Sequence, residues 1–269
     1  MRRTTTALLT VGAVAPTLLL AACGTQTAES SPDMAPVAAV KAAGAATNAA
    51  GSARIALTMT ATVGGKSVPI SVSGPLALDG SKADLTASLP GAMFGSTSGD
   101  LSLHEIVVGK TVYLKFTGAS MLPDQWFKVD GAAALAKAGL GSLGAGSTVG
   151  DSLSTLQSLG DVTEVGTETV NGAEATHYSA TVDPAKLSGL VKALGAHADA
   201  AAALGTARIP VDVWIDGQGR LVRLTESFTA TVNKTTVAEA VRIDLTDFGT
   251  PVTVTAPAGA MDMSGLLGG

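Results

Sequence analysis

Apolar residues occupy every second position over most of the chain beyond residue 51. Ile55, Leu57 and Met59 alternate with Ala and Thr, and the alternation resumes after Gly64-Gly65. A period of two places successive side chains on opposite faces of a strand, and paired glycines favour a tight hairpin turn. The pattern therefore predicts strands at residues 52–63, 68–78, 83–89, 101–108, 111–117, 125–129, 162–170, 173–182, 208–215, 221–232 and 235–248.

The connections between these strands are short and rich in turn residues. Asn171-Gly172 separates two of the runs and is a strong hairpin signal, and Asp216-Gly217 marks a further turn. Consecutive strands joined by short turns pair in antiparallel fashion. We therefore expect a single large curved antiparallel sheet with one apolar face.

Three stretches depart from the period of two and predict helices. An alanine-rich stretch follows a proline at residues 37–50, with Val37 and Val40 as a thin apolar stripe. Residues 183–194 begin with Asp-Pro, a good helix start, and carry leucine and valine at helical spacing. The glycine-rich residues 131–160 predict one or two short helices around a loop. Together with the sheet, these helices indicate an α+β fold.

The N-terminal residues have the organisation of an export signal followed by a tether. Two arginines precede an uncharged run, and the sequence LAAC at residues 20–23 resembles the lipobox of bacterial lipoproteins. In proteins with this motif the cysteine receives a diacylglyceryl group and becomes the first residue after cleavage. We expect a signal peptide at residues 1–22, a lipidated Cys23 with a flexible tether over residues 23–36, and a folded domain at residues 37–269. The expected location is the extracytoplasmic face of the cell membrane, and an ordinary secretory signal is the alternative.

Composition and charge argue against nucleic-acid binding. Removal of the signal leaves 247 of the 269 residues and changes the formal charge from −5 to −7, because two arginines leave with it. A mildly acidic chain without a cluster of Lys or Arg is a poor candidate for binding nucleic acid. No cluster of Arg, Lys or aromatic residues marks a site for a lipid headgroup. The abundance of Gly and Ala indicates a high-GC, actinobacterial genome.

The chain shows no convincing catalytic or metal-binding constellation. Residues 139–144 match G-x-G-x-x-G but follow no strand, so composition explains the match better than nucleotide binding. We interpret His177, beside Tyr178 in a strand, as a hydrogen-bonded structural histidine rather than a general base. His104 with Glu105 would bind a metal only with further ligands that the sequence does not reveal. We therefore predict no enzyme, no cofactor and no metal site.

Three motifs in the second half of the chain carry a family resemblance. They are GTETVNG at residues 166–172, PVDVWID at residues 210–216 and DFGTPV at residues 247–252, and VYL at residues 112–114 agrees with them. With the lipobox, these motifs resemble the LppX/LprG-type lipoproteins of actinobacteria, whose fold is like that of the lipoprotein carriers LolA and LolB. The resemblance implies a half-open antiparallel barrel, closed by a few helices, with a cavity for acyl chains on its concave apolar face.

The pattern and the resemblance indicate the same function. A sheet face lined by aliphatic side chains and capped by a helix offers an apolar site for the acyl chains of a lipid or glycolipid. We predict a membrane-anchored envelope lipoprotein that binds and carries such lipids, with an envelope transporter as a further partner. The alternative is an envelope lipoprotein that serves as an interaction or scaffold module. The predicted cavity lining is Ile55, Leu57, Met59, Ile70, Val72, Val112, Leu114, Phe116, Leu190, Leu194, Val213, Ile215 and Ile243.

Overall fold

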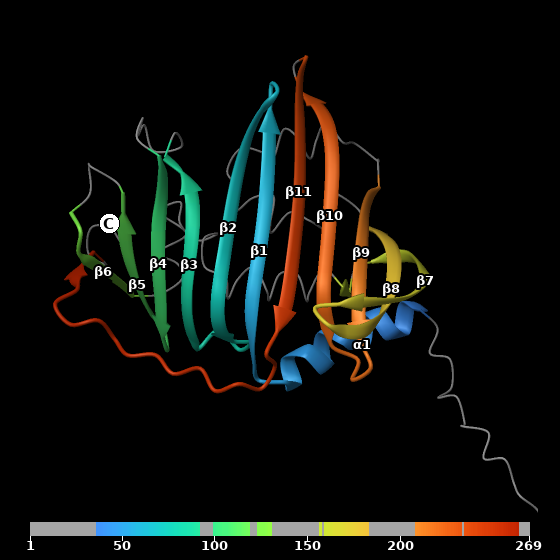
Figure 1. Ribbon diagram of the computed structural model, residues 1–269, viewed down its shortest axis with the longest axis horizontal. Coiled ribbons are helices and arrows are strands. Elements are labelled where there is room, and N and C mark those ends of the chain that lie inside the picture. Colours follow the sequence, from blue (N-terminus) through green and yellow to red (C-terminus); the bar gives the residue numbers. More distant parts are fainter. Residues whose placement is uncertain are drawn as a thin grey trace, which may run out of the picture. The chain divides into compact units, whose positions relative to one another are not determined.

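Every strand of the described part of the chain belongs to one sheet (Figure 1). The computed structural model describes residues 36–91, 99–118, 123–130, 156–157, 159–182, 208–232 and 234–263. All of them lie in the second of two separate units, Met1–Asp33 and Met34–Gly269. Their elements are α1 (Pro36–Ala49), β1 (Ser52–Val63), β2 (Lys66–Ala77), β3 (Lys82–Pro90), β4 (Asp100–Val108), β5 (Thr111–Thr117), β6 (Trp126–Asp130), β7 (Gly160–Val170), β8 (Ala173–Val182), β9 (Ile209–Asp216), β10 (Leu221–Val232), β11 (Thr235–Thr246) and β12 (Met261–Asp262).

The sheet has twelve strands in the order β12-β6-β5-β4-β3-β2-β1-β11-β10-β9-β8-β7. Neighbouring strands are antiparallel except β12, which pairs in parallel with β6. The two end strands, β12 and β7, do not pair with each other, so the sheet is not closed. The predicted large antiparallel sheet is confirmed, with β12 as a parallel strand that the pattern did not predict. The half-open barrel remains a prediction.

Tight turns with left-handed backbone join the hairpins that the sequence predicts. Gly64 and Gly65 have φ values of 58° and 81°, and Asn171 and Gly172 have φ values of 52° and 84°. Positive φ at both central residues is the type I′ geometry, which matches the right-handed twist of paired strands. Glycine and asparagine tolerate this backbone, and therefore they stand at these positions.

The pairing of β1 with β11 joins the two halves of the sheet. It runs from Arg54 opposite Thr246 to Val63 opposite Val237. β1 also pairs with β2 along its whole length, so it is a central strand with both edges bonded. These contacts connect residues far apart in the sequence, and short turns alone do not predict them.

Burial alternates along the strands and defines two faces of the sheet. We call the face that carries Ile55, Leu57 and Met59 of β1, with their register partners on the other strands, the inner face; the opposite one is the outer face. Inner-face side chains from β1 to β6 and from β8 to β11 form one hydrophobic cluster. The outer face is polar along most strands, for example at Thr58 and Thr60. This alternation is the period of two on which the prediction of strands rests.

Helix α1 packs against β7, β9 and β10 through small residues (Figure 1). Its buried residues are Val40, Ala43, Gly44 and Thr47. The Thr47 hydroxyl accepts a hydrogen bond of 2.8 Å from the backbone N–H of Leu221 and thereby fixes the helix to β10. The predicted apolar stripe is wrong at Val37, which is 37% exposed, because alanine, glycine and threonine make the contact surface instead.

The other predicted helices fall almost wholly outside the described residues. This holds for residues 183–194 and for most of residues 131–160. Of the latter, Leu156 and Leu159 are buried in the hydrophobic cluster, and Gly160 belongs to strand β7 rather than to a helix. Within the described ranges, no helix is long and apolar enough to cross a membrane.

Candidate functional site

The described residues of the predicted cavity lining all lie on the inner face. None of them is more than 9% exposed, and all belong to the same hydrophobic cluster. Leu190, Leu194 and the predicted anchor Cys23 lie outside the described residues. The structure therefore brings together side chains from five strands: Ile55, Leu57 and Met59 of β1, Ile70 and Val72 of β2, Val112, Leu114 and Phe116 of β5, Val213 and Ile215 of β9, and Ile243 of β11.

Strand register makes this lining continuous. Leu57 lies opposite Val72 on one side and opposite Ile243 on the other. Met59 likewise lies between Ile70 and Val241. Directly opposed side chains on one face of a sheet contact each other, so these pairs form an unbroken aliphatic surface across β2, β1 and β11.

Three glutamates interrupt this apolar face, and the sequence interpretation did not include them as site residues. Glu105 of β4 is 4% exposed, and Glu226 of β10 and Glu239 of β11 are each 7% exposed. Each occupies the inward phase of its strand, between apolar residues two positions away, as in Leu224-x-Glu226-x-Phe228. A glutamate at a strand position where the alternating pattern predicts a buried apolar residue can be recognised from the sequence, because it places a carboxyl where burial is expected.

Burial changes the acidity of these carboxyls. It raises the pKa of Glu105 to about 7. The pKa of Glu226 is also raised to about 7, first by burial and then by the nearby charge of Glu239. Burial raises the pKa of Glu239 as well. The low dielectric of the apolar face disfavours the charged form, so a substantial fraction of Glu105 and Glu226 is uncharged near neutral pH.

None of the three carboxyls has a hydrogen-bond or ion-pair partner among the described residues. Thr181 Oγ1 is the one fully buried side-chain oxygen without a partner in that part of the chain. Polar groups buried without a partner cost free energy, and natural proteins rarely keep them without a reason.

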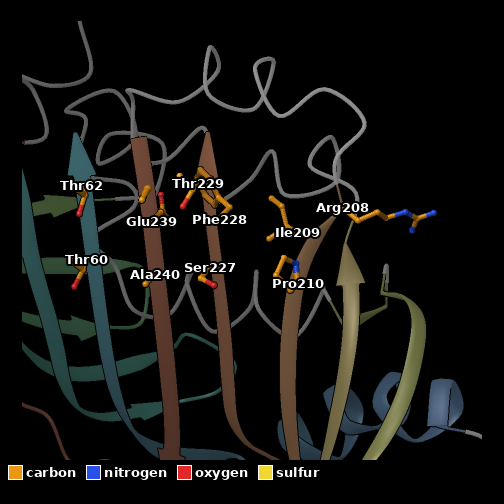
Figure 2. A pocket seen from close by; sticks show the side chains of 11 residues that line it. Thr60, Thr62, Arg208, Ile209, Pro210, Ser227, Phe228, Thr229, Glu239 and Ala240 are labelled. Carbon is orange, nitrogen blue, oxygen red and sulfur yellow. The ribbon is translucent and has the colours of Figure 1, made fainter. Parts of the chain in front are cut away.

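The sheet opens between β9 and β10, close to two of these glutamates. The last residue pair of the two strands is Glu226 with Val211, and beyond it β9 continues to pair with β8 alone. Pro210 stands at this point, and proline has no backbone N–H to donate to a ladder. A hollow of about 500 Å³ lies at the divergence (Figure 2), lined by Thr60, Thr62, Arg208, Ile209, Pro210, Ser227, Phe228, Thr229, Ala238, Glu239 and Ala240.

A second hollow of about 310 Å³ adjoins the first. The two share Thr60, Pro210, Ser227 and Ala240, and the lining of the second includes Glu226. Most of the lining comes from the outer face and consists of small uncharged residues. None of the residues predicted to line the cavity lines either hollow. The two hollows are therefore openings beside the inner face and not the predicted cavity.

His177 belongs to a hydrogen-bonded group on the outer face. Its Nδ1 lies 2.8 Å from Glu168 Oε1, and its Nε2 lies 3.0 Å from Asp212 Oδ1. The ring stacks on Trp214 at a centroid distance of 4.3 Å, and the indole N–H of Trp214 donates to Glu168 at 3.2 Å. The hydrogen bonds predicted for His177 are therefore present, and they tie β7, β8 and β9 together.

His104 and Glu105 do not converge on a common site. They are neighbours in β4 and therefore point to opposite faces of the sheet. His104 Nε2 lies 2.7 Å from Asp84 Oδ1 on β3, and its ring lies 5.0 Å from that of Trp126. Among the described residues no group of three or more His, Cys, Asp or Glu side chains is placed to hold a metal ion.

Comparison with known proteins places this geometry in a family. The family model described as LppX_LprAFG lipoprotein matches residues 35–254. The crystal structure of Mycobacterium tuberculosis lipoprotein LppX is similar, with a TM-score of 0.52 and 18% identity over 83% of this chain and 100% of that one. The crystal structure of LprF from Mycobacterium bovis has a TM-score of 0.50 and 20% identity over 83% of this chain and 97% of that one.

A curated relative covers a smaller part of the chain. It is an uncharacterised 31.2 kDa protein of Streptomyces griseus, 36% identical over 120 residues. The match takes in 42% of this chain and 37% of the relative. At these levels of identity, the two crystal structures show a common fold.

Proposed function

Because the chain belongs to the LppX_LprAFG lipoprotein family, we propose that it binds the acyl chains of lipids on its inner face and carries them within the cell envelope. The observation that carries this proposal is the aliphatic surface that the paired strands β2, β1 and β11 form on the inner face. Leu57, Met59 and Ile243 lie at its centre, and the cluster extends from β6 to β8. The resemblance described above implies the same role and the same face.

The energy of transfer favours a face of this kind. A lipid loses about 0.8 kcal/mol for each methylene that leaves the membrane, so ten methylenes require about 8 kcal/mol from an apolar receptor. Aliphatic side chains supply this by burying the chain, at about 25 cal/mol per Å². The inner face holds few rings, Phe116 and Phe127 being one tilted pair 6.5 Å apart. A lining of Leu, Ile, Val and Met suits flexible acyl chains better than planar ligands.

An anchor at Cys23 would hold this site close to its source of lipid. The proposed lipobox at residues 20–23 places the acylated cysteine ahead of a short polar tether. Two or more acyl chains hold a protein stably on a membrane, whereas one chain holds it only marginally. The tether over residues 23–36 lets the domain reach the headgroup level of the bilayer on the extracytoplasmic side.

The proposal is tested by filling the inner face. The full chain is purified, and bound lipid is identified by native mass spectrometry; transfer of labelled phosphatidylcholine between phosphatidylcholine vesicles is then measured. Leu114→Trp and Ile215→Trp place a bulky ring on the inner face, and Tyr113→Trp is the matched control on the outer face of β5. We expect lipid in the unaltered chain, loss of lipid in both inner-face variants, and no change in the control.

Two results would contradict the proposal. A folded chain that comes out free of lipid, and neither binds nor transfers it, would favour the interaction-module alternative. The same conclusion would follow if both inner-face variants lost about 1–3 kcal/mol of stability through overpacking and had no ligand to lose.

A further inference from the structure

Glu226 and Glu239 form a pair on adjacent strands of the inner face. Glu226 lies opposite Val241, two residues from Glu239 on β11, and Glu239 lies opposite Phe228. Diagonal neighbours in an antiparallel pair are about 7–8 Å apart, within reach of two glutamate side chains. Both carboxyls are more than nine-tenths buried and point to the apolar face. The pair is therefore a small polar site within the aliphatic inner face.

This pair lies where the sheet opens. Glu226 is the last β10 residue paired with β9, and Glu239 contributes to the lining of the hollow of about 500 Å³. Figure 2 shows Ile209 and Phe228 at this divergence of the two strands. Both are inner-face residues, whereas Ser227 and Thr229 of the same lining come from the outer face. The hollow therefore lies in the gap between the two strands, mostly on the outer face, and inner-face residues contribute to its lining.

Neither carboxyl has a hydrogen bond or an ion pair among the described residues. Glu239 lines the hollow of about 500 Å³, and Glu226 lines the adjoining one. Leaving a buried polar group without a hydrogen bond destabilises the folded protein. A ligand group that bonds to the pair would remove this cost when it binds.

The surroundings select the chemistry of that ligand group. Burial raises the pKa of both carboxyls, that of Glu226 to about 7, and a protonated carboxyl donates one hydrogen bond and accepts others. The polar side chains that line the hollow beside Glu239 are mainly hydroxyls, those of Thr60, Thr62, Ser227 and Thr229, and Arg208 is its one cation in the described lining. A phosphate would require more cations, and an ammonium group would require charged carboxylates. An alcohol, which both donates and accepts, fits the pair as it stands.

We propose that Glu226 and Glu239 are the polar end of the lipid site, where they hydrogen-bond a hydroxyl group of the bound lipid while its acyl chains lie along the inner face. This inference rests on the proposed function and adds a ligand class to it: lipids with a free hydroxyl near the acyl chains. The headgroup then lies at the opening between β9 and β10, next to solvent.

The test compares two lipids that differ only in the hydroxyl. The full chain is incubated with phosphatidylcholine vesicles that contain 1,2-dipalmitoylglycerol or its 3-O-methyl ether, and the lipid bound per protein is measured over a range of lipid content. We expect the alcohol to bind about tenfold more tightly, which corresponds to one hydrogen bond of about 1.4 kcal/mol. Hexadecylamine and hexadecanol, compared in the same way, distinguish a cation from a hydroxyl.

Variants assign the preference to the pair. Glu226→Leu/Glu239→Leu should bind the alcohol and the ether equally, whereas Glu226→Gln/Glu239→Gln should keep most of the preference because the amides still hydrogen-bond. Glu105→Leu is the matched control, since it removes a buried inner-face carboxyl on the distant strand β4 and should leave the preference unchanged. Each variant is checked for folding by circular dichroism.

The outcomes separate this inference from the proposed function. Equal binding of alcohol and ether by the unaltered chain would overturn the inference and leave the proposed function standing. A preference that survives in the double leucine variant, or a stronger affinity for hexadecylamine than for hexadecanol, would also overturn it. If the folded chain binds none of these lipids, both proposals fail.

Discussion

Replacing Glu105 by glutamine should reduce the loss of folding stability that accompanies a rise in pH. Glu105 is 4% exposed on the inner face, opposite Leu85 of β3 and Leu114 of β5. Its pKa rises from an ordinary value of 4.5 to about 7 because burial disfavours the carboxylate. Glutamine has the same shape as the protonated acid and carries no charge at any pH, so the variant isolates the effect of ionisation.

The sign and size of the effect follow from proton linkage. Below pH 4.5 Glu105 is protonated in both the folded and the unfolded chain, so its ionisation does not lower the stability of the folded protein. Between pH 4.5 and about 7 the unfolded chain releases the proton while the folded chain retains it, so stability falls as the pH rises. Above pH 7 both states are ionised, and the loss levels off at roughly 3 kcal/mol, at 1.36 kcal/mol for each pKa unit.

The assay is urea unfolding at pH 4 and pH 8, followed by tryptophan fluorescence. The free energy of unfolding of Glu105→Gln, relative to the unaltered chain, should be roughly 3 kcal/mol higher at pH 8 than at pH 4. The control is Glu174→Gln on the exposed start of β8. Its difference in unfolding free energy from the unaltered chain should be the same at pH 4 and pH 8 within about 0.5 kcal/mol. A relative stability of Glu105→Gln that is the same at both pH values would refute the assignment of Glu105 as a buried, partly neutral carboxyl.

Three further changes test the fold and the anchor. Gly74→Ala should cost about 2–4 kcal/mol in urea unfolding, because its φ is +148° and an added Cβ would overlap a backbone carbonyl of β3, whereas Gly217→Ala should be nearly neutral. Asp244→Ala should cost about 1–3 kcal/mol, since its carboxylate accepts hydrogen bonds from arginines of β10 and β11, whereas Asp124→Ala breaks only an exposed ion pair and should cost less than about 1 kcal/mol. Cys23→Ser should release the protein from membranes and abolish labelling with fatty acid, and unchanged fractionation would remove the anchor from the account.

Local patterns predicted most of the strands because their causes are local. Inward and outward side chains alternate with a period of two, and Asn171-Gly172 and Gly64-Gly65 adopt the left-handed turns that these residues favour. The pairing of β1 with β11 was implied only by the assumption of a single sheet, since it joins residues from opposite ends of the domain. β12 was not predicted, because two residues carry no periodicity.

The candidate site was predictable in its apolar part and missed in its polar part. An alternating pattern assigns Leu57 or Ile243 to a buried face with no further information. Glu226 and Glu239 break the same pattern, but only the strand register shows that the two lie side by side. The opening between β9 and β10 lies where the pairing of these two strands stops while β9 still pairs with β8. The sequence around Pro210 alone does not show this point, because it depends on the register of all three strands.

The central claim is that acyl chains lie on the inner face, and photo-crosslinking tests it most directly. The full chain is loaded with palmitic acid that carries a diazirine on its alkyl chain, irradiated, and digested, and the modified residues are identified by mass spectrometry. The account predicts adducts on inner-face residues such as Leu57, Met59 and Val241 and none on their outer-face neighbours Thr58 and Thr60. Adducts confined to the outer face, or a folded chain that acquires no adducts, would contradict it.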